Sequence, residues 1–221
     1  METNSISYHM IAISSFRPKA KCSPQIWENQ INAWNSWVKV FDEIVWFNAP
    51  EPDFEGASFI PTEGKPTIES MAKHASKCND YVAIVNADII LDSKLKGIVD
   101  RMVKNTPCHC ATSLRFNFKP GESPETGTIT DNGLDIFIAH PALWRKVAQF
   151  IPVDFKLGMN AWDTCVLGMF THYSRNMVGD FSQTRTVFHP VHEERGDQFT
   201  PESARRSAFM SLVRWPAIQI A

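Results

Sequence analysis

The sequence predicts an α/β fold in which a mostly parallel central sheet is flanked by helices, and three observations support this class. Short apolar runs bounded by polar residues recur along the chain, as expected for strands that are buried on both faces. Segments with helical periodicity separate these runs in the order β-α-β-β-α-β-α-β up to residue 118. The 221 residues contain no clear linker, internal repeat or low-complexity tract, so we expect one domain over 1–221.

The first half of the chain supplies most of this alternation. We expect strands at 10–13, 43–48, 58–60, 81–91 and 108–118, and helices at 25–38, 67–77 and 93–105. Ser23 and Pro24 favour the start of the first helix, as an N-cap and a first-turn proline. The tryptophans of this helix could form a sugar-stacking platform, but core packing is the more frequent role of such side chains.

The second half is less regular. Residues 120–132 are rich in Gly, Pro, Ser and Thr, which predicts a loop that could be mobile over a site. We then expect a strand at 133–140, a helix at 141–150, a turn at 158–163, a helix at 164–173 and a strand region at 176–188. A small antiparallel element is expected in this half.

Composition excludes several classes of protein. The formal charge of −2 gives no field that would steer the chain onto nucleic acid or an anionic membrane. No apolar run reaches membrane-spanning length, and residues 1–9 do not resemble a signal peptide. Five scattered cysteines favour a reducing compartment, and we predict a cytoplasmic location. Cys108 and Cys110 alternate on a predicted strand and would face opposite sides, which argues against a zinc site there.

Asp88 interrupts the most apolar stretch of the chain, at 81–91. An ionised carboxylate in such a place is costly unless it is paired. A divalent cation at the carboxyl edge of the sheet, where open α/β folds bind their ligands, would be a suitable partner. The alternative is that Asp88 only caps the turn after the strand.

Four short motifs together resemble the GT-A-type nucleotide-diphospho-sugar transferases. They are Asn86-Ala87-Asp88-Ile89, the strand Leu134-Asp135-Ile136-Phe137-Ile138, the turn from Gly158 to Asp163, and His189 with His192. The resemblance covers about residues 8–196 and implies a GT-A-like, Rossmann-related domain. It implies a nucleotide-binding half at about 8–118 and an acceptor and metal half at about 119–196, followed by a C-terminal extension at 197–221.

The resemblance implies a metal site formed by Asp88, His189 and His192. The metal would be Mn²⁺ or Mg²⁺ and would neutralise the charge that grows on the diphosphate of the donor. Asn86 stands where the Asp-x-Asp motif of the family has its first acid. A histidine nitrogen suits Mn²⁺ better than Mg²⁺.

For the catalytic base the resemblance points to Asp163, which would deprotonate the acceptor hydroxyl. A helix N-cap is the competing role for this residue. Asp135, an acid inside an apolar strand, is the rival candidate for the base or a residue that binds the acceptor.

The donor nucleotide is expected across the carboxyl ends of the first strands. Candidate contacts to it share that location: Ser14, Ser15, Arg17, Asn48, Lys65, Asn86 and Arg115. The chain has no Gly-rich phosphate cradle, which disfavours NTP hydrolysis and NAD binding.

The resemblance therefore implies a metal-dependent glycosyltransferase that moves a hexose or pentose from a nucleoside diphosphate sugar, a UDP-sugar being favoured, to a hydroxyl acceptor. The alternatives are a sugar-nucleotide pyrophosphorylase and a nucleotide-sugar-binding domain with little turnover. The sequence leaves open the sugar, the acceptor (a glycan, a lipid-linked sugar, a protein or a modified DNA base), the stereochemical outcome and the oligomeric state.

Overall fold

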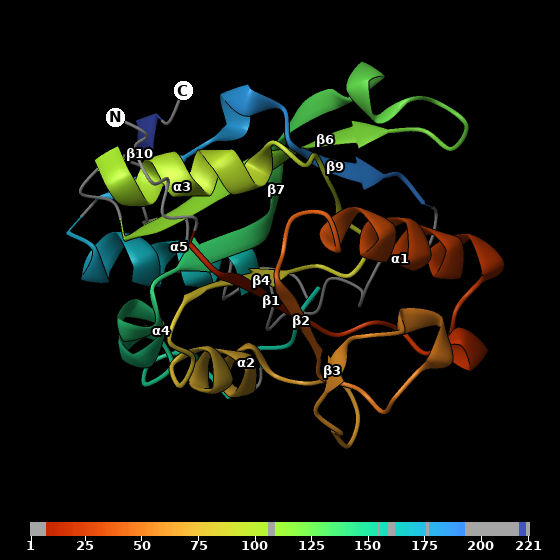
Figure 1. The fold of residues 1–221 in the computed structure, drawn as a ribbon, viewed down its shortest axis with the longest axis horizontal. Helices are drawn as coiled ribbons and strands as arrows, with labels where there is room; N and C mark the ends of the chain where they lie inside the picture. The colour runs from red at the N-terminus through yellow and green to blue at the C-terminus, as the bar shows by residue number, and fades with distance from the viewer. Residues whose placement is uncertain are drawn as a thin grey trace, which may run out of the picture.

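The computed structural model describes residues 8–105, 109–153, 155–158, 162–175, 177–192 and 217–219. Within these residues ten strands form one sheet, with the path β10-β8-β6-β7-β4-β1-β2-β3; β9 pairs with β6 off this path, and β5 pairs with β9. Helices cover both faces of the sheet (Figure 1). The predicted α/β class with a mostly parallel, helix-flanked sheet is confirmed.

The strands are β1 Met10–Ser14, β2 Glu43–Trp46, β3 Ser58–Phe59, β4 Tyr81–Val85, β5 Ile90–Leu91, β6 Cys110–Phe118, β7 Thr128–Ala139, β8 Val178–Asp180, β9 Val187–Pro190 and β10 Ala217–Gln219. The α-helices are α1 Pro24–Trp37, α2 Ile68–Ala75, α3 Leu95–Asn105, α4 Pro141–Val147 and α5 Trp162–Tyr173. Short 3₁₀ turns are η1 Lys19–Lys21, η2 Pro52–Phe54, η3 Pro124–Thr126 and η4 Ser182–Thr184.

Strand direction follows the sequence signals. β3, β2, β1 and β4 pair in parallel, as expected for strands linked by crossover helices. β7 lies antiparallel between β4 and β6, and β5 pairs antiparallel with β9. The antiparallel element expected in the second half is therefore present. It places β7 beside β4 and β9 beside β5, the strand that follows β4.

The two faces of the sheet bury separate clusters. On β4, Ala83 and Val85 pack in the cluster that contains residues of α1 and α3, while Val82 and Ile84 pack in the cluster that contains residues of α2, α4 and α5. This alternation is the two-residue period of a strand with both faces covered. The tryptophans of α1 belong to the core: Trp37 is 0% exposed, and Trp27 and Trp34 are both 8% exposed.

Local capping explains where α1 and α2 begin. The Ser23 hydroxyl accepts a hydrogen bond from Ile26 N at 3.4 Å, and Pro24 occupies the first helical position. In the same way Thr67 accepts from Ser70 N at 3.1 Å. These caps satisfy backbone donors that have no partner inside the helix.

Several predicted boundaries were wrong. The stretch 81–91 is not one strand, because β4 ends at Val85 and the chain turns before β5. The predicted loop 120–132 overlaps β7, which begins at Thr128 because Thr128 and Ile129 pair with Asn117 and Phe116 of β6. Cross-strand pairing outweighs the loop-like composition there.

The rest of that loop is fastened to the sheet. Arg185 donates hydrogen bonds to the carbonyls of Glu125 and Gly127 at 2.8 and 2.9 Å, and its guanidinium lies over the Phe116 ring.

The late strand region predicted at 176–188 is also divided: η4 separates β8 from β9. Helix α4 ends at Val147, earlier than the expected residue 150.

Two further predictions concern the surroundings of the protein. In the part of the chain that the structure describes, no helix has the length and apolarity needed to cross a membrane. Among the described cysteines, Cys22, Cys78, Cys110 and Cys165 are free thiols. Cys108 of the disfavoured zinc motif lies outside the described residues, and Cys110 is fully buried.

Candidate metal centre

Helix α1 makes hydrogen bonds to the backbone just after Asp88. The indole N–H of Trp37 donates to Ile89 O at 2.7 Å, and Leu91 N donates to the Ser36 hydroxyl at 3.0 Å. Both bonds are buried, where an unmade bond would leave a costly orphan group. The last turn of α1 therefore fixes the position of the segment that follows β4.

Pairing of β5 with β9 brings the histidines to Asp88. Ile90 lies opposite Phe188 in an antiparallel pair, so residues just before Ile90 meet residues just after Phe188. Asp88 Oδ2 lies 3.4 Å from His189 Nε2 and 3.1 Å from His192 Nε2. Residues about a hundred positions apart in the sequence thus converge on one carboxylate oxygen.

The donor set fits a divalent cation. Among the described residues, Asp88, His189 and His192 form the cluster whose ligand atoms all lie within 4.8 Å of one another. Neighbouring ligands of an octahedral ion with bonds of about 2.1 Å are separated by about 3 Å, close to the Asp88–imidazole distances. All three side chains are partly buried. The predicted metal ligands are therefore brought together.

The carboxylate is kept in its charged form. Burial raises the pKa of Asp88, but the adjacent imidazoles of His189 and His192 outweigh this effect and hold the pKa well below its ordinary range. An ionised oxygen is what a hard cation requires as a ligand.

Asn117 contacts the other edge of the His189 ring. Its Oδ1 lies 3.2 Å from His189 Nδ1, and the parallel pairing of β6 with β9 places the two residues directly opposite each other. The sequence analysis missed Asn117. Its only signal was an amide in a predicted strand, and the pairing of that strand with β9 was not predictable from periodicity.

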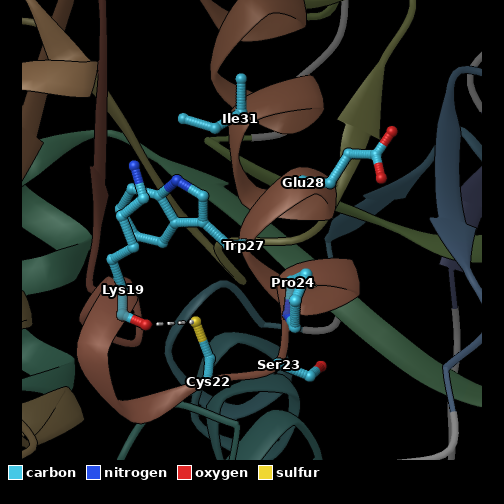
Figure 2. A pocket seen from close by; sticks show the side chains of 7 residues that line it. All are labelled: Lys19, Cys22, Ser23, Pro24, Trp27, Glu28 and Ile31. Atoms are coloured by element: carbon cyan, nitrogen blue, oxygen red, sulfur yellow. Dashed lines mark hydrogen bonds between the residues drawn. The ribbon is translucent and has the colours of Figure 1, made fainter.

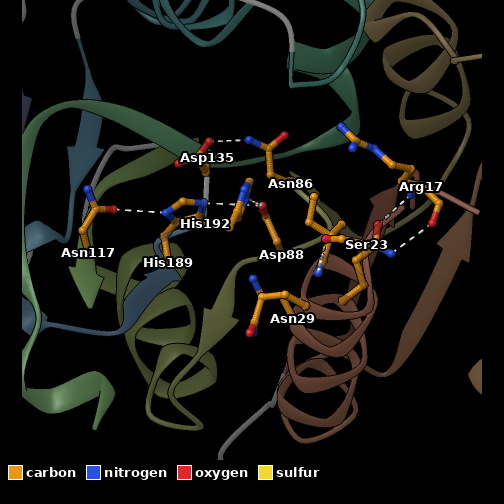
Figure 3. A network of polar contacts seen from close by, with 12 residues as sticks. Arg17, Ser23, Asn29, Asn86, Asp88, Asn117, Asp135, His189 and His192 are labelled. Atoms are coloured by element: carbon orange, nitrogen blue, oxygen red, sulfur yellow. Dashed lines mark hydrogen bonds and ion pairs between the residues drawn. The ribbon is translucent and has the colours of Figure 1, made fainter. Parts of the chain in front are cut away.

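A second polar cluster surrounds Asp135, which is 4% exposed. The Asn86 amide donates to one carboxylate oxygen (Figure 3). The Arg115 guanidinium pairs with the other. β7 carries one more residue than β6 between the pairs Phe137–Thr112 and Leu134–Leu114, which is a bulge at Asp135. Bulges re-aim side chains in this way near functional sites.

Gly133 makes room for Arg115. A Cβ at Gly133 would lie 2.6 Å from Arg115 Nε, so a larger residue would move the guanidinium. Arg115 Nε is buried without a hydrogen-bond partner, so the orientation of this side chain depends on Asp135 and on this close contact.

Asp163 lies in the first turn of α5, which begins at Trp162 rather than at the predicted residue 164. Its Oδ1 accepts from Thr164 N at 2.8 Å, the residue next to it, so it is not the N-cap that was considered as the alternative. Burial is the main cause that raises its pKa, and the neighbouring carboxylate of Asp135 raises it further.

The two clusters are joined through the chain. Asn86 and Asp88 belong to the turn after β4, one reaching Asp135 and the other the histidines. Arg115 and Asn117 are two residues apart on β6, and so project from the same face of the strand. Figure 3 shows the row of polar side chains that results.

The predicted donor-binding residues have mixed positions. Ser14 is fully buried and donates to Val85 O at 2.5 Å, so its hydroxyl ties β1 to β4 and is not open to a ligand. Both ends of the Asn48 amide bond to the backbone of Phe16, at 2.9 and 3.0 Å, which fixes the loop after β1. These two side chains have structural roles.

The remaining candidates lie closer to open space. Ser15 and Arg17 are partly buried in the loop after β1, and Gln30 of α1 hydrogen-bonds the backbone of Arg17. Lys65 is exposed. A Cβ on Gly158 would lie 3.9 Å from Lys65 Nζ and 3.8 Å from Asn86 Oδ1. The Gly158 turn, Lys65 and Asn86 therefore lie near one another.

A separate groove of about 420 Å³ lies beside the first half of α1 (Figure 2). It is lined by Lys19, Cys22, Ser23, Pro24, Trp27, Glu28 and Ile31. The helical residues of this set lie on a different face of α1 from Ser36 and Trp37, which hold the Asp88 turn. The groove is therefore distinct from the candidate metal centre.

Comparison with known proteins finds no match in sequence and a distant likeness in structure. No protein-family model and no curated protein matches this chain. One similar solved structure is a Bacillus anthracis protein assigned as a glucose-1-phosphate thymidylyltransferase, in complex with sucrose. It is 11% identical, the match covers 93% of this chain and 96% of that one, and the TM-score is 0.44.

Proposed function

We propose that this protein is a metal-dependent glycosyltransferase that moves a sugar from a nucleoside diphosphate sugar to a hydroxyl acceptor. The observation that carries the proposal is the convergence of His189 and His192 on Asp88 at the end of β4. The carboxyl end of a parallel strand is where open α/β folds bind their ligands. The motif resemblance, which stands apart from the structural comparison, supplies the class of reaction.

The proposed metal is Mn²⁺ in preference to Mg²⁺, because two of the three ligands are imidazoles. When bound, it would neutralise the negative charge that develops on the leaving diphosphate. One carboxylate and two neutral imidazoles cancel only one of its two charges. The loaded site would therefore attract an anion, and a diphosphate suits it.

We assign the catalytic base to Asp163. Its raised pKa brings it nearer to the value that suits a base at neutral pH. Asp135 is the poorer base, since Arg115 and Asn86 already occupy its two oxygens. We propose that Asp135 orients these groups beside the acceptor and keeps the pKa of Asp163 high.

Contacts to the donor are proposed for the candidates that remain near open space. Lys65 and Arg17 supply positive charge for phosphate oxygens, and Ser15 supplies a hydroxyl. Asn86, which donates a hydrogen bond to Asp135, connects the proposed nucleotide-sugar site to the Asp135 cluster. A UDP-sugar is the favoured donor, and a glycan or another hydroxyl compound, including a modified DNA base, is the acceptor.

The test is nucleotide release from UDP- and GDP-sugars in the presence of Mn²⁺. We expect wild-type protein to release the nucleoside diphosphate, and Asp88→Asn and Asp163→Asn each to lower the rate by at least about 100-fold. Asp80→Asn is the matched control, because Asp80 stands at the opposite end of β4 and pairs only with His9 at 3.6 Å among the described ion pairs.

Two outcomes would overturn the proposal. Absence of any nucleotide binding or release with every donor would remove it altogether. Formation of a nucleotide sugar from a sugar 1-phosphate and a nucleoside triphosphate, with release of pyrophosphate, would replace it with the pyrophosphorylase alternative.

A further inference from the structure

We infer that Asn117 is a positioning residue that holds His189 in the tautomer able to bind a divalent cation. The inference rests on the metal centre of the proposed function but not on sugar transfer. It concerns a residue that no motif marked and that would act on the site through His189.

The geometry places Asn117 and the cation site on opposite edges of one ring. His189 Nδ1 lies 3.2 Å from Asn117 Oδ1, while His189 Nε2 lies 3.4 Å from Asp88 Oδ2. Figure 3 shows the imidazole between these two partners. The His189 side chain is 12% exposed, so little water competes for either nitrogen.

The backbone sets this arrangement. Phe116–Phe188, Asn117–His189 and Phe118–Pro190 are successive pairs of the parallel β6–β9 ladder. The flanking Phe116 and Phe188 are buried and their rings contact each other, which fixes the register on this side of the pair. The amide and the ring therefore cannot slide apart without breaking a packed strand pair.

The chemistry of the amide oxygen decides the tautomer. A neutral imidazole has a hydrogen on one nitrogen and a lone pair on the other. Asn117 Oδ1 can only accept, so it selects the tautomer with the hydrogen on Nδ1. The lone pair is then on Nε2, which faces Asp88. If the amide were turned, so that its NH₂ group donated to Nδ1, the hydrogen would lie on Nε2 and would block coordination.

Partners of this kind matter to a metal site because they fix both the tautomer and the ring orientation. Their loss commonly lowers metal affinity by about 10- to 100-fold. Asn117 shares its face of β6 with Arg115, so a single strand supports both the metal centre and the Asp135 cluster.

The experiment is a titration of the full-length protein with Mn²⁺ alone, followed by the electron paramagnetic resonance signal of the free ion. We expect Asn117→Leu to weaken Mn²⁺ binding by about 10- to 100-fold relative to wild type. Asn117→Asp should restore wild-type affinity or exceed it, because a carboxylate accepts the same hydrogen bond.

A second readout separates positioning from a general packing role. In the metal-free protein Asp88 competes for the ring hydrogen, so the ¹⁵N shifts of the His189 ring should show more hydrogen on Nδ1 in wild type and in Asn117→Asp than in Asn117→Leu. Wild-type affinity in Asn117→Leu, weakened binding in Asn117→Asp, or no more hydrogen on Nδ1 in wild type than in Asn117→Leu would each overturn the inference. Because no nucleotide is present, a failure of sugar transfer would leave these results unchanged, whereas absence of Mn²⁺ binding in wild type would overturn the metal centre and the inference together.

Discussion

Asp163 is a partly buried carboxyl whose ionised form is disfavoured by its surroundings. Burial and the Asp135 charge both disfavour its ionised form. Hydrogen bonds that its carboxylate accepts from Thr164 and Leu134 offset this effect only in part. Its pKa in the folded state is therefore above that in the unfolded state. Near neutral pH, ionisation of this group costs folding free energy.

Asp163→Asn should consequently stabilise the protein at pH 7. The asparagine oxygen can still accept the Thr164 hydrogen bond, but the buried charge is gone. The sign follows from proton binding: as pH rises from the ordinary value of 3.8 through the raised pKa, the folded wild type loses stability relative to the variant. We expect a higher melting temperature for the variant at pH 7, and a gain that disappears below pH 3.8. An equal difference at all pH values would contradict this explanation.

Gly133 controls the position of Arg115. Gly133→Ala would push the guanidinium away from Asp135 and leave a buried carboxylate poorly paired, at a cost of about 1–3 kcal/mol in the free energy of unfolding. Gly97→Ala is the control, because its Cβ would meet only the end of Arg101 at 3.9 Å within helix α3. That change should stabilise by about 0.4–1 kcal/mol. Urea denaturation of both variants measures the contrast, and equal destabilisation would refute it.

At the scale of elements, helix α1 stabilises the turn that carries Asp88 through hydrogen bonds to the residues that follow it. Trp37→Phe would keep the stacking against Trp46 but remove the hydrogen bond to Ile89 O. We expect a loss of about 1–3 kcal/mol in unfolding free energy, together with weaker Mn²⁺ binding, because the turn with Asp88 loses its support. Trp34→Phe, in the same core, should lower stability without a comparable loss of Mn²⁺ affinity. Unchanged Mn²⁺ binding in Trp37→Phe would show that the turn does not depend on α1.

Elements with a clear period were predictable from the sequence. The helix with Ser23 and Pro24 at its start and the parallel strands around β1 follow from local signals that agree with one another. The end of β4 did not follow, because Ile89, Ile90 and Leu91 continue the apolar run after the turn. Only pairing with β9 shows that this stretch is a second, antiparallel strand.

The residues of the candidate site also fall into those that local signals predict and those that only the fold reveals. Asp88 and His189 are marked by residue type and motif, and the β5–β9 pairing then brings them together. Ser14 and Asn48 were given ligand roles from their place after a strand, but the fold uses their side chains to bond its own backbone. Asn117 depends on long-range register and carries no local signal.

At the scale of the whole molecule, we predict that stability depends on cation and nucleotide together. A ligand that binds only the folded state at 100 times its dissociation constant stabilises it by about 2.7 kcal/mol. We expect Mn²⁺ with UDP to raise the melting temperature more than either alone, because the partly neutralised cation attracts the diphosphate. Addition of a chelator should abolish the gain, and a gain from UDP that survives chelation would argue against a metal-mediated site.

The most direct measurement is anomalous X-ray diffraction from crystals soaked with Mn²⁺ and UDP. We predict a manganese peak coordinated by Asp88 Oδ2, His189 Nε2 and His192 Nε2, with the diphosphate completing its coordination. Bound UDP with no manganese at this triad, or manganese bound only elsewhere on the protein, would contradict it.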